Sequence, residues 1–130
     1  RDVAPSRGLG DVYKRQSQNG SSDVWDFLET LRRKGNSSKD ARIQYNQIVF
    51  YIDLLSKNGT NLPTNITKHL EEDIWELRPG NNRVFYFYYA KGCYVLLHHF
   101  RKKSQKTPKR EITRAKYERD DYIRQKEEES

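Results

Sequence analysis

Several residue types that define functional classes are scarce in this chain of 130 residues. It has a single cysteine, Cys93, which excludes an intramolecular disulfide and a cysteine-rich zinc site. No stretch approaches the ~20 consecutive apolar residues that a membrane-spanning helix requires. The glycine-rich phosphate loop, His-Glu-x-x-His, Gly-x-Ser-x-Gly and Cys-x-x-Cys motifs are all missing. We therefore expect a small, soluble, cytoplasmic protein without a metal site.

Acidic residues are absent from a long window of the chain. Residues 78–110 contain nine Lys or Arg and no Asp or Glu, whereas residues 17–77 and 111–130 each carry a net charge of −2. The excess that makes the whole chain +7 therefore lies in one region. Such a window is either a solvated face or a surface for a polyanion, and the composition leaves both readings open.

The first sixteen residues differ from the rest of the chain. They lack apolar periodicity and the apolar core of a secretory signal, and no methionine occurs anywhere. The run SRGLGDVYKRQ resembles translated sequencing-adapter read-through. We predict that residues 1–16 are a non-native segment, with a disordered native tail as the alternative. Residues 17–126 then form one domain, and residues 127–130 form a frayed tail.

Capping signals and apolar spacing predict two N-terminal helices. Ser21 or Ser22 begins a helix near residues 22–34, and Ser37 or Ser38 begins a longer helix that reaches about residue 57. Gly59 is a C-terminal stop. Residues 60–71 are predicted to be a connector, because the Leu-Pro pair within them disfavours regular structure.

The following forty residues change to strand-like composition. Aromatic and β-branched residues dominate 74–78, 83–90 and 94–101, and the separators are hairpin signals, so we expect a three-stranded antiparallel meander. Thr107 and Pro108 then begin a helix to about residue 125. The predicted fold class is α+β, in which a small antiparallel sheet packs against the two N-terminal helices. The helices are expected on one face of the sheet, with a C-terminal helix and room for a further N-terminal strand.

Strand alternation places side chains of the last predicted strand on two faces. One face is expected to carry Val95, Leu97, His99 and Arg101, and the other Tyr94, Leu96, His98 and Phe100. His98 and His99 then point in opposite directions and cannot chelate one metal.

The basic residues converge near one predicted hairpin. Arg78 closes the first strand of the meander and Arg83 opens the second, while residues 101–110 leave the sheet with six positive charges. This convergence suits the phosphates of a nucleic acid.

Three segments together resemble a known family. The sequences DIWELR at 73–78, RVFYF at 83–87 and LLHHFRKKSQKTP at 96–108 are similar to the RelE/ParE superfamily of toxin–antitoxin toxins, most closely its HigB-like, phage-derived branch. The resemblance covers roughly residues 17–122. It implies a toxin that cleaves mRNA in the ribosomal decoding site without a metal or other cofactor. It also implies a cognate antitoxin partner, expected to be of the helix-turn-helix type, and a first strand preceding residue 19.

The resemblance also implies site residues. Arg83 matches a transition-state arginine, Arg78 a substrate-positioning arginine, and Lys102 and Lys103 a basic pair suited to acid–base work, with His99 as a weaker candidate. Arginine grips phosphate with two parallel hydrogen bonds, whereas the lysine ammonium is more readily shifted in its protonation. The residues expected to bind the RNA backbone are Lys68, Arg101, Lys106, Lys109 and Arg110.

One departure leaves the mechanism open. Some superfamily members carry a catalytic tyrosine or histidine close to the C-terminal helix, and Tyr117 and Tyr122 lie too far along that helix to match it. The general base is therefore unassigned. Two alternatives stay open, a gyrase inhibitor on a similar fold and a basic nucleic-acid binding module without catalysis.

Overall fold

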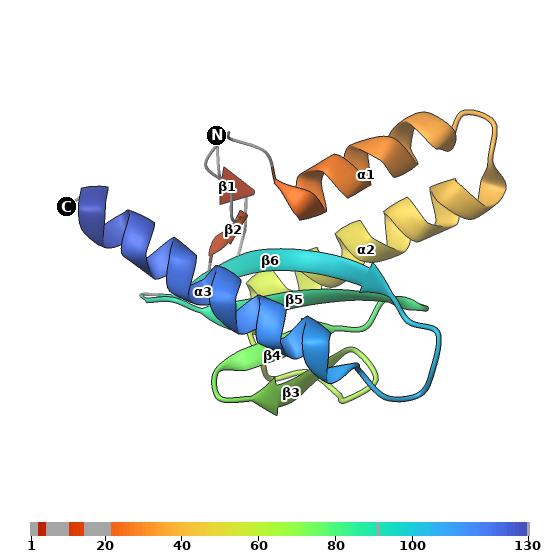
Figure 1. Cartoon of the computed structure of the whole chain (residues 1–130). Helices are drawn as coiled ribbons and strands as arrows, with labels where there is room; N and C mark the ends of the chain where they lie inside the picture. The colour runs from red at the N-terminus through yellow and green to blue at the C-terminus, as the bar shows by residue number, and fades with distance from the viewer. Residues whose placement is uncertain (1–2, 5–10, 15–21, 91, 130) are drawn as a thin grey trace.

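The computed structural model of the chain describes residues 3–4, 11–14, 22–90 and 92–129. Its elements are, in order, β1 (Val3–Ala4), β2 (Asp11–Lys14), α1 (Asp23–Lys34), α2 (Lys39–Asn58), β3 (Thr67–Glu71), β4 (Ile74–Leu77), β5 (Asn82–Tyr88), β6 (Cys93–Arg101) and α3 (Lys109–Glu129). The strands form one sheet in the order β1-β2-β6-β5-β4-β3. Figure 1 shows α3 across one face of this sheet, with α1 and α2 at the other. The predicted α+β class is confirmed.

Local signals account for both N-terminal helices. The Ser22 side chain accepts a hydrogen bond from the Trp25 N–H, and the Ser38 side chain accepts one from the Ala41 N–H, which satisfies donors that have no partner within the helix. Gly59 ends α2 at a φ of 60°, and a Cβ there would meet the Tyr94 hydroxyl at 2.5 Å. Glycine is therefore required both by the backbone and by the space.

The predicted meander is confirmed as β4, β5 and β6, which pair antiparallel. The predicted alternation along β6 is wrong in its second half. The pairing shifts by one residue between Val84 and Tyr86, so that β6 contains a bulge at Leu97 and His98. Beyond the bulge, His98 joins the face of Val95 and Leu97, and His99 the opposite face. The two histidines still point to opposite sides of the sheet, as predicted.

The prediction that residues 60–71 form only a connector is wrong for their second half. Thr67–Glu71 form β3, the edge strand beside β4. The Thr67 hydroxyl donates to the Glu76 carbonyl at 2.9 Å and lies 2.6 Å from the Tyr86 hydroxyl. The proline affects only the chain before β3, and pairing with β4 determines the conformation after it.

The sheet also has strands at its N-terminal end. β2 pairs parallel with β6 from Asp11 to Lys14, and β1 pairs antiparallel with β2. The further N-terminal strand for which the sequence left room is therefore present, within residues 1–16. That this segment is non-native stays a prediction, which genomic sequence upstream of Ser17 would test.

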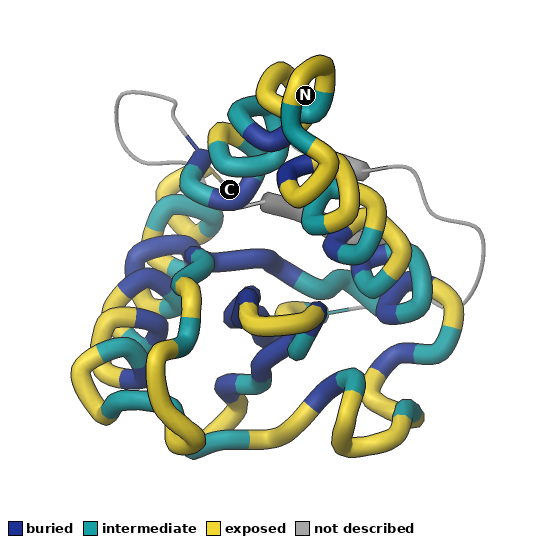
Figure 2. The backbone as a smooth tube through the Cα atoms, turned by 90° about the vertical axis from the view of Figure 1, so that its right-hand side faces the viewer, coloured by how far each residue is buried: buried dark blue, intermediate teal, exposed yellow. Residues whose placement is uncertain are grey.

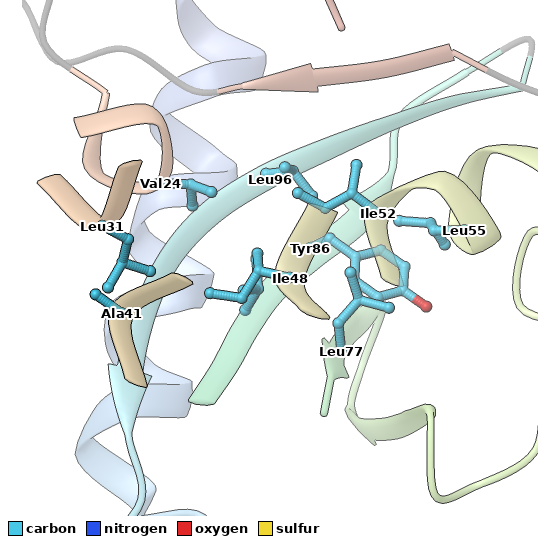
Figure 3. Packing of buried hydrophobic residues seen from close by; sticks show 10 residues of the cluster. Val24, Leu31, Ala41, Ile48, Ile52, Leu55, Leu77, Tyr86 and Leu96 are labelled. Carbon is cyan, nitrogen blue, oxygen red and sulfur yellow. The ribbon is translucent and has the colours of Figure 1, made fainter. Parts of the chain in front are cut away.

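The expectation that all helices share one face is wrong. One buried cluster joins α1 and α2 to Leu77, Tyr86 and Leu96, and Figure 3 shows its side chains between α2 and the strands. A second cluster joins α3 to Phe85, Phe87 and other residues of the opposite face. Six of the seven β5 residues are buried, so both faces need a cover. In Figure 2 the exposed surface lies mainly on the outer sides of the helices and on loops.

The last helix is longer than predicted. α3 begins at Lys109 and continues to Glu129, through residues 127–129 that were expected to fray. The hydroxyl of Thr107, the predicted cap, donates to Glu76 Oε1 at 2.9 Å. Thr107 therefore connects the start of α3 to the sheet.

Candidate nucleic-acid interface

The cationic residues gather at the end of the sheet where β4 leads into β5 and where β6 ends. Arg78 directly follows β4 and Arg83 lies at the start of β5. The Lys102 N–H donates to the Asn81 carbonyl at 2.8 Å, so the chain leaving β6 is attached to the β4–β5 turn. The predicted convergence of the two basic segments is therefore present in the structure. We call this region the hairpin end.

Arg83 is buried at the hairpin end, with only 5% of its side chain exposed. Its Nη1 donates to the carbonyls of Gly80 and Asn82, both at 2.8 Å, and its Nε lies 3.8 Å from Glu76 Oε2. Burial lowers the pKa of Arg83, although the charge of Glu76 opposes this shift. The guanidinium is thus engaged by the protein itself, in a geometry that stabilises the turn.

Arg78 is placed differently, because a quarter of its side chain is exposed. Its Nη1 donates to the Thr64 carbonyl at 2.8 Å, and its Nε lies 3.4 Å from Glu76 Oε2. That Nε is buried and has no hydrogen-bond partner among the described residues. The protein therefore fixes the orientation of the Arg78 guanidinium but satisfies only some of its N–H donors.

Arg78 lines a pocket of about 320 Å³ on the α3 side of the sheet. We call it the basic pocket, since Lys68 and Lys106 also line it and are exposed. The other polar residues in its wall are His69, Glu71, Glu76, Gln105 and Thr107. Glu76 lies against Arg78, and Glu71 is paired with Lys109 and Lys116. The three cations at the opening can therefore attract an anion such as a phosphodiester.

Glu76 is the carboxylate on which this arrangement depends, and sequence reasoning did not single it out. It is 1% exposed. Its Oε2 faces both arginines and its Oε1 accepts from Thr107. A charged residue at a position that strand periodicity would bury was the available signal. Because a buried charge must be paired, Glu76 holds Arg78 and Arg83 in fixed relative positions.

The predicted acid–base pair, Lys102 and Lys103, and the predicted RNA-binding residues Lys109 and Arg110 differ in exposure and pairing. Lys103 and Arg110 are exposed, and Lys102 is half-buried. The Lys109 Nζ donates to both Glu71 oxygens, at 3.0 and 2.8 Å, which connects α3 to β3. The charge of Lys109 is therefore already neutralised locally.

Arg101 and His99 lie on the opposite face of the sheet from the basic pocket. They line a second pocket of about 360 Å³ between the α1–α2 pair and the end of β6, with Gln44 and Asn82 also in its wall. We call it the helical pocket. The structure thus divides the predicted site residues between two pockets that flank the hairpin end.

His99 is held from two sides in the helical pocket. Its ring stacks on Phe27 with centroids 3.8 Å apart, and its Nδ1 lies 2.5 Å from Asp23 Oδ1. The same oxygen accepts from the His99 backbone N–H at 2.9 Å. Asp23 lies in the first turn of α1, and sequence reasoning gave it no part in the site. The contact with His99 crosses 76 positions of the chain, and no local pattern could have revealed it.

With the fold and the hairpin end described, the comparison with known families can be stated. The family model of the phage-derived Gp49-like proteins (DUF891) matches residues 35–120. The chain belongs to this family. It is a family of RelE/ParE-like toxins, so this Gp49-like chain is of the toxin–antitoxin type and has an antitoxin as its expected partner. No curated protein matches the chain in sequence.

Three further observations concern the described residues of this Gp49-like chain. In the part of the chain that the structure describes, no group of three or more His, Cys, Asp or Glu residues is arranged to hold a metal ion. Nor is any helix within the described ranges both long and apolar enough to cross a bilayer. Tyr117 is 64% exposed, and Tyr122 is buried among aromatic rings.

Proposed function

We propose that this Gp49-like protein is a HigB-like toxin that cleaves mRNA on the ribosome, in the cytoplasm and without a metal ion or cofactor. The observation that carries the proposal is the basic pocket. There a partly exposed arginine is oriented by a buried carboxylate and lies beside two exposed lysines. An RNA phosphodiester is the substrate group that this arrangement fits, since the guanidinium can pair with two phosphate oxygens at once.

Metal-independent cleavage of RNA proceeds by attack of the ribose 2′-oxygen on the adjacent phosphorus. The 2′-OH loses its proton to a base, the bond from phosphorus to the 5′-oxygen of the next nucleotide breaks, and that oxygen takes up a proton. Nearby cations can stabilise the negative charge that develops on the phosphorane. We assign Arg78 to this stabilisation, and Lys68 and Lys106 to positioning the RNA backbone. Lys102, Lys103 and Arg110 extend the cationic surface towards the rest of the mRNA and the ribosome.

Arg83 receives a different role from the one that the resemblance implies. Its guanidinium donates to two backbone carbonyls and pairs with Glu76. Few of its N–H donors therefore remain free to bind substrate. We propose that Arg83 is a positioning residue that fixes the turn and Glu76, and through Glu76 the orientation of Arg78.

The two arginines can be separated by experiment. Arg78→Ala is expected to lower the mRNA cleavage rate about 100-fold, as loss of a transition-state donor does, with a smaller loss of stability than Arg83→Ala because a quarter of the Arg78 side chain is exposed. Arg83→Ala is expected to lower the free energy of unfolding by about 3 kcal/mol, because Glu76 would lose a buried partner. Urea unfolding and in-cell mapping of mRNA 5′ ends measure the two effects. Lys57→Ala, which removes a surface cation of α2 paired with Asp53, is the matched control.

The same mapping tests the activity itself. Induction of the wild-type chain is expected to arrest growth with mRNA cuts in frame with the codons. Growth arrest without such cuts would refute the ribonuclease proposal, and a simultaneous loss of DNA supercoiling would favour gyrase inhibition. A neighbouring gene for a short helix-turn-helix protein would support the proposed antitoxin partner.

A further inference from the structure

The helical pocket has a volume of about 360 Å³, and the proposed cleavage chemistry does not use it. It lies on the opposite face of the sheet from the basic pocket, so its residues do not contact a phosphodiester bound there. Phe27, Leu31 and Ala41 form an apolar part of its wall, and the exposed residues Lys34 and Arg101 add two cations. This combination fits a flat apolar ring that is attached to an anionic group.

Asn82 is the most deeply buried polar residue of this pocket, with 1% of its surface exposed. Its Nδ2 donates to Gln44 Oε1 at 2.9 Å, and Arg101 Nη1 donates to the same oxygen at 3.2 Å. The Gln44 Nε2 donates to Asp40 Oδ2 at 2.6 Å. The other polar atom of Asn82, Oδ1, is buried and has no hydrogen-bond partner among the described residues.

The charged ends of this chain of hydrogen bonds determine which way both amides point. A guanidinium has no acceptor, and a carboxylate has no donor. Gln44 must therefore turn its oxygen towards Arg101 and its nitrogen towards Asp40. Asn82 must in turn direct its nitrogen towards the Gln44 oxygen, so the free atom of Asn82 is fixed as an acceptor.

A buried acceptor without a partner is costly, so the pocket favours a ligand that donates an N–H to it. Adenine, cytosine and guanine combine a flat ring with an exocyclic amino group, which uracil lacks. The rings of Phe27 and His99 are stacked with centroids 3.8 Å apart, and unpaired bases stack on aromatic side chains of this kind. Lys34 and Arg101 outnumber Asp40 in the wall, which favours the phosphate groups beside the base.

We infer that the helical pocket binds an unpaired nucleobase that carries an amino group, and that Asn82 recognises this group. The inference rests on the proposed function in one respect, namely that RNA supplies the base. Because the two pockets lie on opposite faces of the sheet, the base belongs to a different nucleotide from the one at the scissile phosphate. The helical pocket is therefore a recognition site, and none of its residues takes part in breaking the bond.

The first experiment measures binding without cleavage. The full chain is titrated with AMP, CMP, GMP and UMP, and with tetranucleotides of adenosine, cytidine or uridine, by calorimetry and by the NMR signals of the side-chain amides. The wild-type chain is expected to bind the amino-bearing bases about 10-fold more tightly than uridine. The Asn82 and Gln44 amide signals are expected to shift only with the amino-bearing bases.

Variants assign this preference to the pocket. Asn82→Ala is expected to abolish the preference and to leave the affinity for uridine within about twofold, because uracil offers no amino group. Lys34→Ala changes an exposed residue and is expected to weaken all the nucleotides about two- to threefold, with the preference retained. Lys57→Ala, the surface cation of α2 that pairs with Asp53, is the matched control and is expected to bind like wild type.

A second experiment identifies the source of the base, since mRNA, ribosomal RNA and a free nucleotide share this chemistry. Wild type and Asn82→Ala are sedimented with vacant ribosomes and with ribosomes that carry a defined mRNA. Weaker binding of Asn82→Ala to vacant ribosomes would assign the base to ribosomal RNA, and weaker binding only in the presence of mRNA would assign it to the message. A loss confined to mononucleotides would assign it to a free nucleotide.

Three results would overturn the inference. They are failure of every nucleotide to bind, equal binding of uridine and the amino-bearing bases by wild type, and a preference that a folded Asn82→Ala protein retains. If Asn82→Ala instead loses affinity only for the purified antitoxin, the pocket receives a protein side chain and the inference is also wrong. Absence of mRNA cleavage by the wild-type chain would refute the ribonuclease proposal alone, because base binding is measured without cleavage.

Discussion

On the face of the sheet covered by α1 and α2, the buried helix residues carry no charge. They are Val24, Leu31, Ala41, Ile48, Ile52, Leu55 and Ser56. On the face covered by α3, two of the five buried helix residues, Glu118 and Asp121, are carboxylates. The sheet beneath α3 also contributes buried His98, Glu76 and Arg83. One protein thus attaches its helices to the two faces of one sheet by different chemistry.

The difference determines how each face responds to change. Apolar packing is non-directional and depends mainly on buried area and shape. Buried ionic contacts add little net stability when complete, but removal of one partner is costly. We therefore expect the contribution of the apolar cluster beneath α1 and α2 to change little with pH, and the α3 face to be sensitive to the loss of single charges. Three variants test this comparison.

The largest effect is expected from His98→Ala. The ring of His98 is fully buried, with Nδ1 2.6 Å from Glu118 Oε1 and Nε2 2.9 Å from Glu111 Oε1. Its removal leaves both glutamates without that partner, and we expect a loss of about 4 kcal/mol in the free energy of unfolding, measured with urea. The double variant His98→Leu/Glu118→Leu is the control and is expected to lie much closer to wild type. A single-variant loss below about 1 kcal/mol would mean that apolar contacts alone hold α3.

Leu55→Ala tests the apolar face. Leu55 is completely buried in the cluster beneath α2, so its truncation removes apolar area and leaves a cavity. We expect a loss of about 3 kcal/mol, equal at neutral and mildly acidic pH because no titrating group is involved. Val49→Ala on the same helix, where the side chain is 41% exposed, is expected to cost well under half as much. A strongly pH-dependent loss for Leu55→Ala would contradict the proposed difference between the faces.

The smallest effect is expected at the rim of the α3 face. Hydrogen bonds from Lys109 and Lys116 lower the pKa of Glu71 to about 2 from its usual 4.5. Because folding lowers the pKa of Glu71, the stabilisation that its ionised form provides is complete above the pKa of Glu71 in the unfolded chain. It is lost as the pH falls from about 4.5 to about 2. The difference in stability between wild type and Glu71→Gln should shrink over that range, measured by urea unfolding at each pH.

Because Glu71 is at the surface, the difference should be small and weaker in high salt. A difference that does not vary with pH would contradict this role.

Local sequence signals accounted for most of the fold. The caps at Ser22 and Ser38, the stop at Gly59 and the three strands of the meander all followed from short-range patterns. The bulge in β6 and the edge strand β3 did not, because both depend on pairing with a neighbouring strand. The bulge directs His98 towards α3 and His99 into the helical pocket.

The candidate site was predictable in composition but not in arrangement. The acid-free window contains most of the predicted cations, although Lys68 lies outside it, and the resemblance identified the family type. Neither showed that Arg83 is enclosed while Arg78 is partly exposed, because both follow from the position of Glu76. The partners Asp23 and Glu76 were missed, since an acidic residue far away in the chain carries no local sign of its contact.

The sequence by itself determined the two N-terminal helices, the start of the last helix and the three strands of the meander. It also concentrated positive charge in one segment, because caps, periodicity and charge are properties of neighbouring residues. Only the tertiary structure decided which cations are enclosed, which face outward, and which carboxylates lie against them. Burial and pairing depend on residues that meet across the sheet. Residues of the acid-free window thus line two separate pockets, one on each side of the hairpin end.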